Sequence, residues 1–335
     1  MSSKGLEKTL QKLRDSVNNG NYYEAQQMYR TVARRYNKQQ KYTDTIRLLH
    51  DGAILLFKHK QNGSASDLAN YMLETYKMAH LPVNEESLDR VAEILSLFPI
   101  AEVGRKAFIS NAFRWTKDEG DYTEGDPDLH DFVGTMFFNE KQYSLAEDHL
   151  LVGTDHSAEL IGKLAYYWAV EENAQWKGIY LARIVFQFLV SKDIHHAILA
   201  YKNFIKAGSQ PVVADSKVRR APAEEPTPFH IYADPWLNFT QMLLLTVQRD
   251  GKDLFIELKK KYEGLYGNEA NFEELVDEIG LAFFNIPKPM KQGNMMQDLM
   301  AKLFSGGGGG GNNPLLQLGG ASGAAASKPS GEDLD

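Results

Sequence analysis

The 335-residue sequence contains no cysteine, which excludes disulfide bonds and thiolate metal sites. Long apolar runs are also missing. The longest, at 184–190 and 242–247, fall far short of the roughly 20 residues that cross a bilayer. No apolar leader segment follows Met1. We therefore expect a cytosolic protein that does not insert directly into a membrane.

Signatures of catalysis are absent from the sequence as well. It has no P-loop, no His-Glu-x-x-His pair and no Gly-x-Ser-x-Gly elbow. The glycine run at 306–311 follows no expected strand and reflects composition alone. His195 and His196 are neighbours, and neighbours on a helix point about 100° apart, which argues against joint chelation of a metal. We expect no enzyme, no cofactor and no metal site.

The net charge of −7 is unevenly distributed along the chain. Residues 1–60 carry 12 Lys and Arg against 5 Asp and Glu, so the rest of the chain carries −14. A basic end on an acidic chain indicates a contact steered by electrostatics, although solubility of the helices is an equal alternative. An RNA-binding helical repeat is a further hypothesis. The acidic chain as a whole disfavours it, so nucleic acid is not an expected partner.

Helical periodicity dominates what is present. Leu6, Leu10, Leu13 and Val17 follow i, i+4, i+7 and i+11, and no sustained period-2 alternation indicates a large sheet. Asp-Pro pairs, Asn84 and a capping-box pattern at 64–67 predict helix starts. The expected helices span residues 4–18, 22–38, 42–60, 65–80, 85–98, 101–118, 127–139, 142–153, 156–172, 176–191, 193–207, 235–249, 251–265, 270–285 and 292–304.

A short repeat lies at several helix starts. Residues 20–25 and 141–146 have the form small-x-Tyr-x-x-Ala or close to it, and 40–45 and 192–197 are looser copies. An apolar residue there packs on the neighbouring helix, and the small residue one turn later lets the backbones approach. This is typical of tetratricopeptide-type hairpins, although the spacing is not a regular 34 residues. We predict an all-α fold, a right-handed α-solenoid of about seven tetratricopeptide-like helical hairpins.

Three segments depart from this pattern. Residues 208–234 contain four prolines, and 212–213 with 229–232 are predicted to pair as a short β-hairpin-like protrusion. The Met-rich helix expected at 292–304 either caps the solenoid or binds elsewhere, and we favour the cap. Residues 305–335 are rich in Gly, Ala, Ser and Asn, which predicts a flexible tail.

Five collinear segments between residues 5 and 305 resemble the Golgi-to-ER traffic protein four family, a scaffold in the guided entry of tail-anchored membrane proteins. The segments are 20–31, 64–68 with 73–74, 237–245, 283–287 and 295–300. The resemblance implies a non-catalytic α-solenoid that brings a substrate-laden co-chaperone to a targeting ATPase. It implies an ATPase-docking half at 1–155 and an adaptor-binding half at 156–304, ahead of the tail at 305–335.

The resemblance also assigns candidate contact residues. Docking of the ATPase is expected at the basic cluster of the second helix and at Asp67, the acidic contact of the family. The C-terminal half is expected to hold a ubiquitin-like adaptor or a BAG-family chaperone beside the protrusion. The ATPase-binding residues are Arg30, Arg34, Arg35, Lys38 and Asp67. The adaptor-binding residues are Phe229, Ile231, Tyr232, Trp236, Phe239 and Leu243.

Two alternatives stay open from the residues alone. The stripe of Trp236, Phe239 and Leu243 follows i, i+3 and i+7, a spacing that suits either a surface for a partner helix or ordinary core. The chain can also be a generic helical-repeat subunit of another cytosolic assembly, such as a coat or a regulatory-particle lid.

Overall fold

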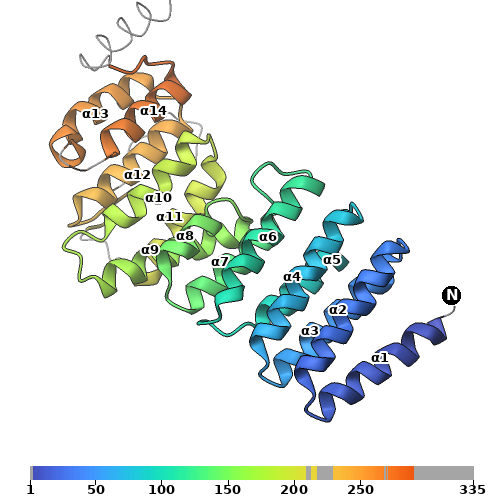
Figure 1. Ribbon diagram of the computed structural model, residues 1–335. Coiled ribbons are helices and arrows are strands. Elements are labelled where there is room, and N and C mark those ends of the chain that lie inside the picture. Colours follow the sequence, from blue (N-terminus) through green and yellow to red (C-terminus); the bar gives the residue numbers. More distant parts are fainter. Residues whose placement is uncertain (1–2, 209–212, 217–228, 268, 270, 290–335) are drawn as a thin grey trace, which may run out of the picture. The chain divides into compact units, whose positions relative to one another are not determined.

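The computed structural model describes residues 3–208, 213–216, 229–267, 269 and 271–289. This part of the chain holds fourteen helices and one two-stranded sheet, so the predicted all-α class is confirmed (Figure 1). The helix expected at 292–304 and the tail at 305–335 lie outside the described residues. The helices are α1 Ser3–Asn18, α2 Tyr22–Lys38, α3 Tyr42–Lys58, α4 Asn62–Met78, α5 Glu85–Leu97, α6 Val103–Glu119, α7 Pro127–Asn139, α8 Tyr143–Leu150, α9 Asp155–Glu171, α10 Gly178–Val190, α11 Ile194–Gly208, α12 Pro235–Gln248, α13 Lys252–Tyr266 and α14 Phe272–Phe284.

Residues Met1–Pro287 form one compact unit, within which most helix contacts join helices one or two places apart in the chain. α1, for example, contacts α2 and α3, and α2 contacts α3 and α4. A single apolar core runs through these contacts from Leu10 to Phe284. Stacked hairpins that share a continuous core define an α-solenoid, as predicted.

One type of turn closes most of the hairpins. A residue with left-handed φ, between 46° and 81°, ends each of several helices. The residue after it donates its N–H to the carbonyl five positions back, as from Lys41 to Tyr36 and from Gln61 to Leu56, at 3.0 and 2.9 Å. This is the Schellman geometry, which satisfies carbonyls that the helix end leaves free. The residues with left-handed φ in this series are Gly20, Gln40, Lys60, His80, Lys141, Asn173, Lys192 and Asp250.

The turn explains the short repeat found in the sequence. The first position of the motif has left-handed φ, as at Gly20. The third position begins the next helix, as Tyr22 does, and the sixth is buried, as Ala25 is. The segment 60–65 is a further copy, which escaped notice because Asn62 stands where the others have Tyr or Ile.

This copy overturns the capping box expected at 64–67. The turn begins α4 at Asn62, with Gln61 as its N-cap residue, so Ser64 lies inside the first turn of the helix. Three other predicted caps are confirmed. Asp126 and Asp234 accept hydrogen bonds from the first N–H groups of α7 and α12, and Asn84 with Ser87 forms a capping box on α5.

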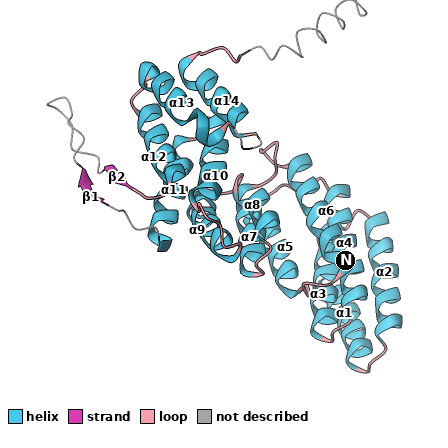
Figure 2. Cartoon of the chain, turned by 90° about the vertical axis from the view of Figure 1, so that its left-hand side faces the viewer, coloured by secondary structure: helices cyan, strands magenta, loops and turns pink. Residues whose placement is uncertain are grey.

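The predicted protrusion contains a short hairpin. Strand β1, Val213–Ser216, pairs antiparallel with β2, Phe229–Ile231, and the pairing joins Val213 to Ile231 and Ser216 to Phe229 (Figure 2). Residues 212 and 217–228 lie outside the described part of the chain. β2 leads through Asp234 into α12, and it contacts that helix directly.

Candidate functional site

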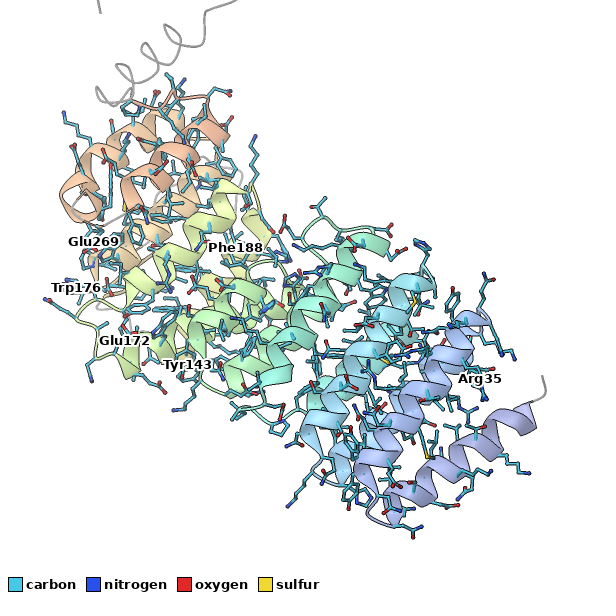
Figure 3. All side chains as sticks on the ribbon, in the orientation of Figure 1. Arg35, Tyr143, Glu172, Trp176, Phe188 and Glu269 are labelled. Atoms are coloured by element: carbon cyan, nitrogen blue, oxygen red, sulfur yellow. The ribbon has the colours of Figure 1, made fainter. Side chains whose placement is uncertain are left out.

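The first candidate surface lies on α2. Arg34, Arg35 and Lys38 are exposed there, and we call these three residues the α2 basic face. Within the described residues, no carboxylate oxygen lies within 4.0 Å of their charged groups. The guanidinium of Arg35 lies over the ring of Tyr36, 5.4 Å from its centroid, and Figure 3 shows Arg35 at the surface of α2. These positive charges are therefore available to a partner.

Arg30 and Asp67, which the family resemblance groups with that face, are engaged with each other. The guanidinium of Arg30 pairs with the carboxylate of Asp67 on α4 and also lies over the ring of Tyr71. Gln26 donates a second hydrogen bond to the same carboxylate, at 2.6 Å. The hydrogen bond to Asp67 raises the pKa of Arg30, whose charge is locally neutralised.

The predicted adaptor stripe on α12 lies inside the fold. Trp236, Phe239 and Leu243 are no more than 2% exposed. Trp236 packs on Phe272 of α14, with ring centroids 4.6 Å apart, and Phe239 stacks on the tyrosines of α13. The structure therefore places this stripe in the core between α10, α13 and α14. Direct contact between the adaptor and this stripe stays a prediction.

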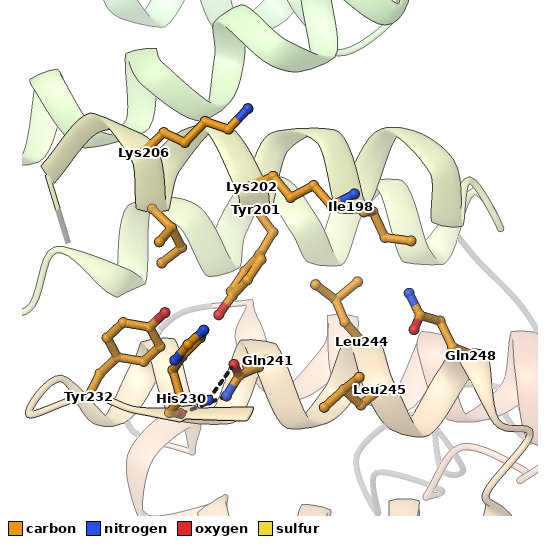
Figure 4. Close-up of a pocket in the computed structure, with 11 residues that line it drawn as sticks. Ile198, Tyr201, Lys202, Lys206, His230, Tyr232, Gln241, Leu244, Leu245 and Gln248 are labelled. Carbon is orange, nitrogen blue, oxygen red and sulfur yellow. Dashed lines mark hydrogen bonds between the residues drawn. The ribbon is translucent and has the colours of Figure 1, made fainter. Parts of the chain in front are cut away.

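An apolar cavity of about 530 Å³ lies on the other side of α12, facing α11 (Figure 4). The residues that line it are Ile198, Tyr201, Lys202, Ile205, Lys206, His230, Tyr232, Gln241, Leu244, Leu245 and Gln248. Its size and apolar lining are typical of binding pockets. Of the sequence-predicted adaptor residues, only Tyr232 lines it. Ile231 is 39% exposed on β2, and the side chain of Phe229 is outside the described part.

Two side-chain amides of α12 hold β2 as one wall of this cavity. Gln241 accepts from the N–H of His230 at 3.2 Å and donates to its carbonyl at 2.8 Å. Asn238, one turn earlier, makes the same pair of bonds to Tyr232, at 2.9 and 2.8 Å. The two amides stand in for a neighbouring strand, because they bond alternate residues, His230 in β2 and Tyr232 directly after it. The wall is therefore fixed to the helix.

Most of the residues that line the cavity were not predicted from the sequence. Its α11 wall, with Ile198, Tyr201 and Ile205, carries ordinary helical periodicity that does not separate a cavity lining from core. The signal that was available is the proline-rich segment before α12, which places an irregular wall beside two helices.

The adjacent histidines correct one expectation. The Nε2 atoms of His195 and His196 lie 3.2 and 3.0 Å from the same oxygen, Oδ1 of Asp155, although neighbouring helical residues were expected to diverge. Imidazole side chains are long enough to swing back to a shared acceptor. Among the described residues, no group of three His, Asp or Glu side chains is arranged to hold a metal ion.

These features define an α-solenoid with an exposed basic face at α2 and an apolar cavity at α11 and α12. No helix in the described residues has the length and hydropathy to span a membrane. The family model for Golgi to ER traffic protein 4 matches residues 39–304, which is most of the chain. The chain belongs to this family. The match begins directly after Lys38, so the α2 basic face precedes it.

Individual relatives agree with the family model. Golgi to ER traffic protein 4 of Schizosaccharomyces pombe is 31% identical over 284 residues, covering 85% of this chain and 91% of that protein. The human homolog is 31% identical over 304 residues, covering 89% of this chain and 87% of that protein. A crystal structure described as C. therm. Get4 superposes with a TM-score of 0.78 at 30% identity, covering 95% of this chain and all of that one.

Proposed function

We propose that this protein is a non-catalytic scaffold in the post-translational targeting of tail-anchored membrane proteins to the endoplasmic reticulum. In this proposal it works in the cytosol and bridges a targeting ATPase and a ubiquitin-like adaptor, or a BAG-family chaperone. Membership in a family named for traffic between Golgi and ER supports the pathway. Two chemically different surfaces on one solenoid support the bridge.

The α2 basic face is the proposed dock for the ATPase. It supplies Arg34, Arg35 and Lys38, exposed and without carboxylate partners among the described residues. Unpaired surface cations steer an acidic partner and set the salt dependence of its binding. Arg30 and Asp67 border this face as an ion pair, so we propose that they shape it and adjust its charge.

The cavity beside α12 is the proposed dock for the adaptor. It lies in the C-terminal half, next to the hairpin that the sequence singled out. Eight helices, α3 to α10, come between the two docks in chain order. The proposed division at residue 155 is compatible with this separation, since it gives each half one partner, although residues Met1–Pro287 form one compact unit.

A calorimetric titration of the full chain with the ATPase tests the function most simply. The triple variant Arg34→Glu/Arg35→Glu/Lys38→Glu is expected to bind at least about tenfold more weakly, and with a smaller salt dependence, because attraction becomes repulsion. The matched control reverses three exposed lysines of α13, Lys252, Lys260 and Lys261. Unchanged affinity in the α2 variant would remove the ATPase dock from this face.

A further inference from the structure

The three most exposed large apolar side chains among the described residues lie near the same ends of the first six helices. Val103 is 90% exposed, Tyr23 is 74% exposed and Ile100 is 62% exposed. Tyr23 follows the α1–α2 turn, Ile100 lies in the loop between α5 and α6, and Val103 begins α6. Exposed apolar side chains that gather in one place indicate a surface that something else covers.

Contacts between the turns place these side chains on one continuous surface. At the α3–α4 turn, His59 meets Tyr22 of the α1–α2 turn, with ring centroids 5.6 Å apart. On its other side, Phe57 meets Phe98 of the α5–α6 loop, with ring centroids 4.7 Å apart. Figure 1 shows the α1–α2 and α3–α4 turns at the lower edge of these helices. We call this surface the turn edge, and it consists of residues 18–24, 58–64 and 98–106.

Lysines share the turn edge with the apolar side chains. Lys58, Lys60 and Lys106 are exposed, and among the described residues no carboxylate oxygen lies within 4.0 Å of their ammonium groups. The carboxylates of the turn edge belong to Glu24 and Glu102, so the exposed lysines outnumber them. Aliphatic, tyrosine and lysine side chains that are exposed together are typical of surfaces that lie at the headgroup level of an anionic bilayer.

We propose that the turn edge binds the surface of an anionic lipid bilayer. The side chains of Tyr23, Ile100 and Val103 enter the headgroup region, while the lysines attract the lipid phosphates and carboxylates. The chain lies on the bilayer, since no helix in the described residues has the length and hydropathy to span it. The α2 basic face begins at Arg34, roughly 16 Å along α2 from Tyr23 at 1.5 Å per residue, so the two surfaces are separate. This proposal does not depend on the proposed function.

Flotation of the full chain with vesicles tests the charges. Phosphatidylcholine vesicles that contain about 30% phosphatidylserine should carry the chain upward, and pure phosphatidylcholine vesicles should not. Binding should weaken as the salt concentration rises. The triple variant Lys58→Glu/Lys60→Glu/Lys106→Glu should partition at least about tenfold more weakly. Two controls with the same change in charge should retain binding, and they are Arg34→Glu/Arg35→Glu/Lys38→Glu and Lys252→Glu/Lys260→Glu/Lys261→Glu.

A second experiment tests the apolar side chains at constant charge. Ile100→Ser/Val103→Ser should weaken partitioning into the phosphatidylserine vesicles by about fivefold. Leu254→Ser/Ile256→Ser, which removes two exposed apolar side chains from α13, should not change it. Because the chain contains no cysteine, Val103→Cys provides a single site for an environment-sensitive dye. Its emission should shift to the blue when vesicles are added, and the emission of the same dye on Leu254→Cys should not.

Four other results would overturn the proposal. Absent flotation, or equal flotation with both kinds of vesicle, would show that the turn edge has no affinity for anionic lipid. Equal losses in the turn-edge and α2 triple variants would show attraction by overall charge without a site. If Lys58→Glu/Lys60→Glu/Lys106→Glu weakens ATPase binding and leaves flotation unchanged, the turn edge belongs to the ATPase dock. Self-association in sedimentation that Ile100→Ser/Val103→Ser abolishes, without flotation, would assign the turn edge to a second copy.

Discussion

Arg30 of α2 and Asp67 of α4 form an ion pair although 37 residues separate them in the chain. The family resemblance assigns both to the ATPase contact, and their pairing gives them a role before any partner arrives. Gln26 adds a second bond to the same carboxylate, so Asp67 joins two turns of α2 to α4. The pair thereby fixes the edge of the α2 basic face and removes one positive charge from it.

Neutralising Asp67 should change the stability of the fold little but should change the affinity for the ATPase, because it alters the net charge beside the α2 basic face. Both side chains of the pair are about one-third exposed, so a double-mutant cycle of Arg30→Ala and Asp67→Asn should give a coupling of about 0.2–1 kcal/mol in urea unfolding. Asp67→Asn alone should tighten ATPase binding, since it releases Arg30 as a further cation. Weaker binding at unchanged stability would show instead that Asp67 contacts the ATPase itself.

The stability of the protein should depend on pH through a histidine pair, of which His130 is buried and His149 is partly buried. Nδ1 of His149 lies 3.0 Å from Nδ1 of His130, whose Nε2 lies 3.1 Å from the carbonyl of Glu124. A carbonyl only accepts, so His130 donates through Nε2 and neutral His130 accepts from His149 through Nδ1. Burial, and then repulsion from His130 when both rings are protonated, lowers the pKa of His149 to about 4.

Because the pKa of His149 is lowered in the folded protein, stability should decrease as the pH falls. The folded-state pKa lies below the unfolded value near 6.5, so the stabilisation is complete above pH 6.5 and is lost as pH falls toward 4. The free energy of unfolding should fall by about 2 kcal/mol between pH 7 and pH 5. His149→Phe should flatten this slope in urea titrations, and His80→Gln, at an exposed histidine, should retain it. Equal slopes in all three proteins would contradict the assignment.

Truncating Trp236 should act on folding first. The side chain is 2% exposed against Phe272, so Trp236→Ala should lower the free energy of unfolding by about 3–5 kcal/mol. Trp176→Ala is the matched control, because Trp176 is 39% exposed and should cost less than about 1 kcal/mol. Loss of adaptor binding by Trp236→Ala with its helical circular dichroism and melting point intact would instead favour a direct contact.

Removing the Gln241 amide should release β2. Gln241→Leu keeps the volume but leaves the N–H and carbonyl of His230 without their partner, at a cost of about 2 kcal/mol. Amide hydrogen exchange at residues 230–232 should become faster, whereas exchange within α11 should not change. Gln248→Leu, at an exposed position of the same helix, serves as the control. Unchanged exchange at His230 would show that β1 alone holds the strand.

The helices were largely predictable because their signals are local. The caps at Asn84, Asp126 and Asp234 and the repeated turn motif fix helix starts through residues within one turn of each other. The predicted start of α4 was wrong because Ser64 and Asp67 resemble a capping box. The residue that sets the start is Lys60, which has left-handed φ, and a lysine does not indicate that conformation in a sequence.

The site was less predictable because its residues meet only in three dimensions. Sequence patterns identified the exposed cations of α2, but not that Arg30 is paired with Asp67 on another helix. The i, i+3, i+7 stripe of Trp236 was compatible with core or surface, since α12 is covered by helices on one side and borders a cavity on the other. That cavity depends on the approach of α11, which no local pattern encodes.

The central claim is that one chain holds two proteins at once through separate surfaces. Mass photometry of the full chain mixed with ATPase and adaptor measures this directly, and we predict a species that contains all three. Arg34→Glu/Arg35→Glu/Lys38→Glu should lose only the ATPase, and Lys202→Glu/Lys206→Glu should lose only the adaptor. Competition between ATPase and adaptor, or loss of both partners from either folded variant, would contradict the account.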